Sequence, residues 1–140
     1  MDSLFWSRLH GGATHFPIAL IFAAALCDGL GLFWRECKRQ QEFRLLGYWL
    51  AIFAALSCFG AVFSGLALAN WKIGGAGFVW RHHLFVWPAF GLIVALGAWR
   101  FLVGSEMSRR ASALYLAAML TACVLVSAAG FFGGEMLLGH

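Results

Sequence analysis

Charge is scarce in this sequence of 140 residues. Only 11% of the residues are Asp, Glu, Lys or Arg, which is less than half of the roughly 25% found in soluble domains. So few charges cannot cover a water-soluble globule of this size. Disorder is excluded as well, because 62% of the residues are hydrophobic and disordered chains are poor in such residues. The length suits one domain, covering residues 1–140.

Proline and paired cysteines are also nearly absent. The two prolines, Pro17 and Pro88, are expected in the first turns of helices, where a missing N–H costs little. The four cysteines are not spaced as metal ligands, and we interpret them as small hydrophobic side chains. No Cys-x-x-Cys-His motif occurs, which excludes a covalently attached c-type haem.

The sequence contains four long apolar runs instead, at residues 16–34, 45–69, 84–103 and 111–133. Each run is long enough to cross a hydrocarbon core, which takes about 20 helical residues. Asp28 is the only acidic residue within them, and Arg100 is expected to snorkel from the end of the third run. The sequence therefore predicts an all-α integral membrane protein, a multi-pass four-helix bundle surrounded by lipid.

Basic residues are unevenly distributed between the two sides of this bundle. Seven of the ten lie at or in the connections between runs one and two and runs three and four. The other side holds Arg8, Lys72 and Arg81. The positive-inside rule then places both termini outside, on the periplasmic side of a bacterial inner membrane. The net charge of +4 thus reflects topology, and no nucleic-acid partner is expected. No internal repeat is apparent.

All five histidines fall on the outer side of this topology. They lie where the first and third runs begin and at the end of the chain: His10, His15, His82, His83 and His140. Histidine is the commonest metal ligand, and helix bundles build such sites from facing helices. The alternative is that these histidines hydrogen-bond lipid headgroups or helix ends.

Helical facing favours His83 over His82 as the inward-facing histidine. Gly91 and Ala95 follow His83 at helical spacing, and small residues mark close approach in membrane bundles. His15 is followed by alanines at the same spacing. These small residues fit either plain helix packing or a slot for a flat macrocycle.

A b-type haem with two histidine ligands fits this arrangement. His15 and His83 are the predicted axial ligands, with His10, His82 and His140 as substitutes or supporting groups. The alternative is a copper or iron site made from three or four histidines. Zinc catalysis is disfavoured, because the outer side has few carboxylates.

Asp28 cannot join the histidines directly. It lies 13 residues from His15, which is about 20 Å along a helix. We interpret it as a neutral or hydrogen-bonded acid that holds helices together near Arg35. The alternative is a role in a proton path or in quinone contact.

The segment from His10 to Leu20, His-Gly-Gly-Ala-Thr-His-Phe-Pro-Ile-Ala-Leu, resembles the opening of the bacterial membrane-protein family called domain of unknown function 2231. The closing Gly-Gly and the terminal Gly-His, residues 133–140, are similar to the family's ending, and a histidine begins the third helix. Gly11 departs from the pattern, since proline often follows the first histidine. The resemblance implies kinship with four-helix b-type cytochromes, and some family members are fused to cytochrome c modules.

The leading hypothesis is a haem b subunit that transfers electrons between the quinone pool and a periplasmic redox partner such as a cytochrome c. The chain has no large soluble domain, so it is expected to act with other subunits of a membrane complex rather than as a stand-alone enzyme. The alternatives are a cofactor-free anchor subunit of such a complex, and a copper- or iron-binding membrane protein.

Overall fold

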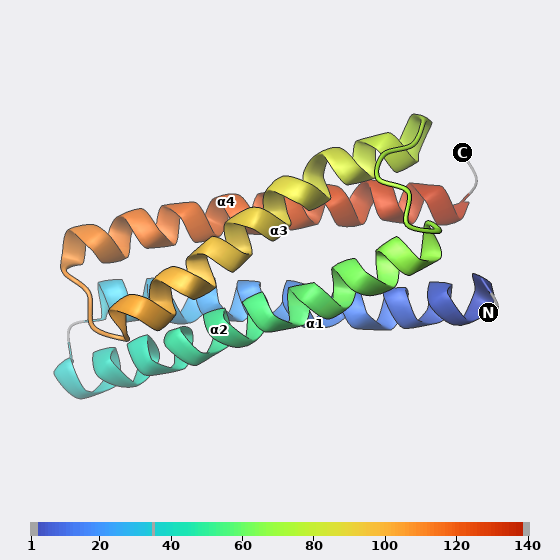
Figure 1. Ribbon diagram of the computed structural model, residues 1–140. Coiled ribbons are helices and arrows are strands. Elements are labelled where there is room, and N and C mark those ends of the chain that lie inside the picture. Colours follow the sequence, from blue (N-terminus) through green and yellow to red (C-terminus); the bar gives the residue numbers. More distant parts are fainter. Residues whose placement is uncertain (1–2, 35, 139–140) are drawn as a thin grey trace.

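The computed structural model describes residues 3–34 and 36–138. It consists of four long helices: α1 (Ser3–Phe33), α2 (Cys37–Leu68), α3 (Gly77–Val103) and α4 (Arg109–Leu138). They run up and down the bundle, and each helix packs against the next along the chain, with α4 returning to α1 (Figure 1). All four are long and apolar enough to cross a membrane. The predicted all-α architecture with four candidate spans is confirmed.

The helices extend beyond the apolar runs. The first apolar run begins at residue 16, but α1 begins at Ser3, and α3 begins at Gly77 rather than at residue 84. Hydropathy identifies only the part of a helix that is apolar enough to lie in the hydrocarbon core. The helix itself continues for as long as each added residue gains a backbone hydrogen bond. Pro17 and Pro88 therefore lie inside α1 and α3, and their expected placement in first turns was wrong.

The outer surface of the bundle is covered with large apolar side chains. Leu26, Leu56 and Leu114 are 64%, 61% and 69% exposed, and every helix carries others like them. In water a surface of this kind would aggregate. Hydrocarbon solvates it, so the exposed apolar surface agrees with the spans in indicating a membrane protein.

Small residues let the helices approach closely inside the bundle. Ala24, Ala54 and Ala122 are completely buried. Gly97 of α3 lies directly against Ala55 of α2, and a Cβ added at Gly97 would collide with the Ala55 Cβ. Side chains of minimal volume at such contacts are typical of helix packing in membranes.

Gly97→Ala is expected to destabilise the bundle by about 1–3 kcal/mol, because the added methyl group overpacks the α2–α3 contact. Gly91→Ala is the matched control, since Gly91 lies on the same helix and has nothing within 4 Å of an added Cβ. Both changes raise helix propensity equally. Thermal unfolding in detergent measures the difference, and equal unfolding temperatures for the two variants would contradict the close contact.

The two helical hairpins bury side chains in the same register. Residues 72 positions apart in α1 and α3 are both buried, namely Pro17 and Ala89, Ile21 and Ile93, Ala24 and Leu96, Ala25 and Gly97, and Asp28 and Arg100. In α2 and α4 the offset is 68, and the buried pairs are Gly47 and Tyr115, Ala51 and Met119, Ala54 and Ala122, Ala55 and Cys123, and Ala61 and Ala129. The hairpin α3–α4 thus repeats the burial pattern of α1–α2, although only three of these ten pairs consist of identical residues.

Candidate functional site

Each buried stripe has a half-buried histidine at one end and a buried charged residue toward the other. On α1 these are His10 and Asp28, which is followed by the buried Gly31, and on α3 they are His82 and Arg100. Both pairs are 18 residues apart, which is about 27 Å along a helix. The bundle therefore has a polar centre at each end of an apolar core. The histidine end lies beside the α2–α3 connection, where α1 begins and α4 ends (Figure 1).

His10 reaches from α1 to the backbone of α2. Its Nδ1 lies 3.0 Å from the carbonyl oxygen of Ala61 and 3.2 Å from the hydroxyl oxygen of Ser64. The ring packs on Gly65, where an added Cβ would come within 2.8 Å of the His10 Cε1. A carbonyl oxygen only accepts hydrogen bonds, so the neutral ring carries its proton on Nδ1 and keeps a free lone pair on Nε2.

His82 repeats this arrangement between α3 and α4. Its Nδ1 lies 2.8 Å from the carbonyl oxygen of Ala129, and an added Cβ at Gly133 would be 3.3 Å from the same nitrogen. The neutral His82 ring therefore also carries its proton on Nδ1 and its lone pair on Nε2. Two imidazoles with the same tautomer thus occupy equivalent positions at the same end of the two hairpins.

The other predicted histidines are held differently. The backbone N–H of Gly74 donates to His83 Nδ1 at 3.1 Å, so the neutral His83 ring carries its proton on Nε2 and its lone pair is occupied. The ring centroids of His82 and His83 are 5.8 Å apart. His15 is exposed, because five residues along a helix place it about 140° around α1 from His10. His140 lies outside the described residues.

The small residues that follow His83 at helical spacing lie on the outside of the bundle. Gly91 and Ala95 are exposed, whereas the row that follows His82 at seven and eleven residues, Ala89 and Ile93, is buried. Glycine and alanine occur on both faces of these helices, so small size alone did not identify the interior. The shared spacing from each histidine to a charged residue 18 positions later was the more informative signal in the sequence.

Trp87 adds a buried donor beside the histidines. Its indole Nε1 is buried and has no hydrogen-bond partner within the described part of the chain. The Trp87 ring lies 6.3 Å from the His83 ring and 6.5 Å from that of Phe90. An indole N–H is only a donor, so it is suited to an acceptor oxygen on a bound molecule.

The polar centre at the other end is an ion pair between Asp28 of α1 and Arg100 of α3. Arg100 is 1% exposed and its guanidinium carbon lies 4.7 Å from the centroid of the Tyr115 ring. A Cβ added at Gly47 would lie 2.9 Å from the Asp28 Cγ, so this glycine leaves room for the carboxylate. The expectation that Arg100 snorkels was wrong, because its stripe faces the interior. Within the described residues the partner of Asp28 is Arg100. Arg35, near which Asp28 was expected to hold helices together, lies outside them.

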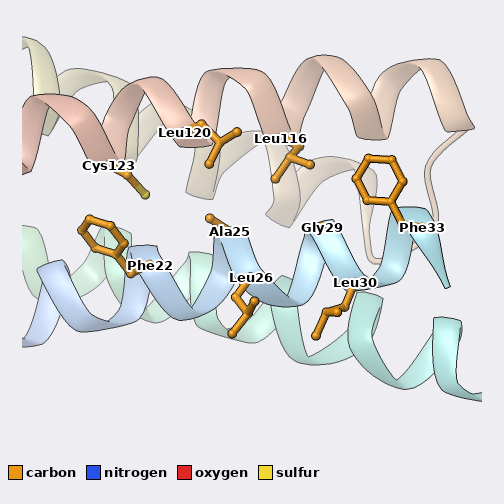
Figure 2. A pocket seen from close by; sticks show the side chains of 9 residues that line it. All are labelled: Phe22, Ala25, Leu26, Gly29, Leu30, Phe33, Leu116, Leu120 and Cys123. Atoms are coloured by element: carbon orange, nitrogen blue, oxygen red, sulfur yellow. The ribbon is translucent and has the colours of Figure 1, made fainter.

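A lateral groove between α1 and α4 carries no comparable chemistry. Figure 2 shows nine side chains or glycines around it: Phe22, Ala25, Leu26, Gly29, Leu30, Phe33, Leu116, Leu120 and Cys123. Apart from the Cys123 thiol these groups are hydrocarbon. The groove therefore offers a surface to lipid chains and not a reactive centre.

Gly65→Ala is expected to prevent the His10 ring from reaching Ala61, because the added methyl group would overlap the ring. Gly60→Ala is the matched control on the same helix, since nothing lies within 4 Å of an added Cβ there. The 15N NMR spectrum of histidine-labelled protein checks this, with the protonated Nδ1 signal of His10 lost or shifted only in Gly65→Ala. The same response in both variants would contradict the packing of His10 on Gly65.

Comparison with known proteins gives a family but no closer relative. No curated protein and no solved structure matches the chain. Within the described residues, no group of three or more His, Cys, Asp or Glu side chains could hold a metal ion. A family model described as "Predicted membrane protein (DUF2231)" matches residues 7–140 and thus includes both hairpins. The chain belongs to this family of predicted membrane proteins, as the resemblance in its opening and closing motifs indicated.

Proposed function

We propose that the chain holds one haem b between His10 and His82 and serves as an electron-transfer subunit of a bacterial inner-membrane complex. The observation that carries the proposal is the matched state of the two imidazoles. Each donates its Nδ1 proton to a backbone carbonyl of the neighbouring helix, which leaves Nε2 free to bind iron. This choice replaces His15 and His83, because one is exposed and the lone pair of the other is occupied.

The donor set fits haem better than a bare metal ion. Copper, iron and zinc sites built from protein alone usually take three or four ligands. Two imidazoles are sufficient for haem, since the porphyrin supplies the remaining four nitrogens. The unpartnered Trp87 N–H also fits, because a porphyrin brings carboxylate oxygens and a quinone brings carbonyl oxygens.

The basic residues favour an orientation with the histidine pair near the periplasmic surface. The α1–α2 and α3–α4 connections lie at the opposite end of the bundle (Figure 1). The helices Cys37–Leu68 and Arg109–Leu138 begin there, and they bring Lys38, Arg39, Arg44, Arg109 and Arg110. Placing these residues in the cytoplasm follows the positive-inside rule.

In this orientation the chain's own residues hold and insulate a redox centre. A bound haem iron supplies reversible one-electron chemistry. His10 and His82 would hold the haem iron, Ala61 and Ala129 orient the two rings, and the apolar core below them would exclude water. A centre near the outer surface is accessible to quinones in the bilayer and to a periplasmic partner such as a cytochrome c.

The proposal is tested on protein purified from membranes in mild detergent. We expect a Soret band, sharp bands in the dithionite-reduced spectrum and one haem per chain after pyridine extraction. Protein free of haem would overturn the proposal and favour a cofactor-free anchor subunit. Copper or iron without porphyrin in elemental analysis would favour a metal-handling protein instead.

A further inference from the structure

One difference between the two hairpins lies at the carbonyl that orients each histidine. Ser64 of α2 lies 68 residues before Phe132 of α4, the offset that relates the buried residues of these helices. We propose that Ser64 is a positioning residue that makes His10 a weaker electron donor to the iron than His82, and so raises the reduction potential of the site. This inference rests on the proposed function for its redox consequence.

Ser64 shares the carbonyl that orients His10. It is 1% exposed, and its hydroxyl donates to the Ala61 oxygen at 2.9 Å. The Nδ1 of His10 lies 3.0 Å from the same oxygen and 3.2 Å from the Ser64 Oγ. The His10 N–H is therefore divided between two acceptors, one of which already accepts another proton.

Among the described residues, no side chain other than His82 hydrogen-bonds to the Ala129 carbonyl, which otherwise accepts only within its own helix. The single bond from its Nδ1 to Ala129 is shorter, at 2.8 Å. Phe132, the equivalent of Ser64, stacks instead on Phe85, with ring centroids 5.5 Å apart and planes 11° apart. The Ser64 hydroxyl thus lowers the acceptor strength available to the Nδ1 of His10, and no hydroxyl in the described residues does so for His82.

This difference has a direct electronic consequence. A strong hydrogen bond from Nδ1–H makes an imidazole a more basic ligand, and a more basic ligand favours the ferric state. Dividing that hydrogen bond weakens the effect at His10 alone. Ser64 would therefore favour the ferrous state of a bound haem, relative to a site in which no hydroxyl shares the carbonyl of either histidine.

Ser64→Ala tests the proposal. Ser57→Ala is the matched control, because the Ser57 hydroxyl donates to the Ala54 oxygen at 2.9 Å on the same helix and no histidine among the described residues hydrogen-bonds to that oxygen. In the haem-loaded protein, Ser64→Ala is expected to shift the midpoint potential to a more negative value. Ser64→Thr, which restores the hydroxyl, and Ser57→Ala are expected to match the wild type. An unchanged or more positive potential in Ser64→Ala would overturn the proposal.

A second measurement separates this inference from the presence of haem. In histidine-labelled apoprotein, Ser64→Ala is expected to move the Nδ1 proton resonance of His10 downfield, because the hydrogen bond to Ala61 strengthens. The Nδ1 proton resonance of His82 is expected to keep its wild-type chemical shift. If the protein binds no haem, the proposed function fails, and the resonance alone decides whether Ser64 weakens the His10 bond. A stationary His10 resonance would overturn that role.

Discussion

Substitution of alanine for either His10 or His82 is expected to abolish the low-spin haem spectrum of the purified protein. Each change removes one of the two imidazoles whose Nε2 is free. Loss of a ligand is expected to lower haem occupancy by at least about ten-fold, since changes even in supporting residues cost 10–100-fold in metal sites. Optical spectra and haem-to-protein ratios measure the effect, and any haem that remains is expected to be high-spin.

His15→Ala and His83→Ala are the matched controls for this prediction. His15 is exposed and His83 accepts from Gly74 through Nδ1, so both variants are expected to keep wild-type haem content. Added imidazole is expected to restore the low-spin spectrum of His10→Ala and His82→Ala by occupying the vacated space. If His15→Ala or His83→Ala lost the haem while His10→Ala and His82→Ala kept it, the assignment of the ligands would be wrong.

Removal of one member of the Asp28–Arg100 pair is expected to destabilise the protein by about 3–5 kcal/mol, because the remaining charge is left buried and uncompensated. Both side chains are more than nine-tenths buried. Asp28→Asn and Arg100→Met are suitable single changes, since each preserves most of the volume. The double variant is expected to regain most of the lost stability, as replacing both charges of a buried pair is often nearly neutral.

A double-mutant cycle measures this coupling through thermal or denaturant unfolding in detergent. The haem spectrum of the folded single variants is expected to be unchanged, because the pair lies about 27 Å from the histidines along the helices. Additive losses in the double variant would show that the two charges do not stabilise each other. A change in the haem spectrum of the folded variants would contradict the separation of the two centres.

The helices and their membrane character follow from the sequence, but the choice among the histidines does not. Hydropathy locates the apolar spans because it depends on local composition. The tautomer of His10 depends on the Ala61 carbonyl, which lies on another helix and 51 positions away along the chain. Similarly, Arg100 pairs with Asp28 from a position 72 residues away on α3, so local sequence does not indicate this pair.

One feature of the site was nevertheless present in the sequence. His10 and Asp28, like His82 and Arg100, are separated by 18 residues, which is five turns of helix. Residues at this spacing share one helix face. Two helices that each carry a histidine and a charge on a common face indicate two polar centres in one bundle, and burial confirms that this face is the interior.

The electron paramagnetic resonance spectrum of the oxidised, purified protein tests most directly whether His10 and His82 are the residues that would hold a haem iron. We predict the low-spin signal of iron with two imidazole ligands, present at one haem per chain in the wild type and absent from the variant His10→Ala/His82→Ala. The same low-spin signal in that double variant, or a purified wild-type protein without any haem signal, would contradict the account.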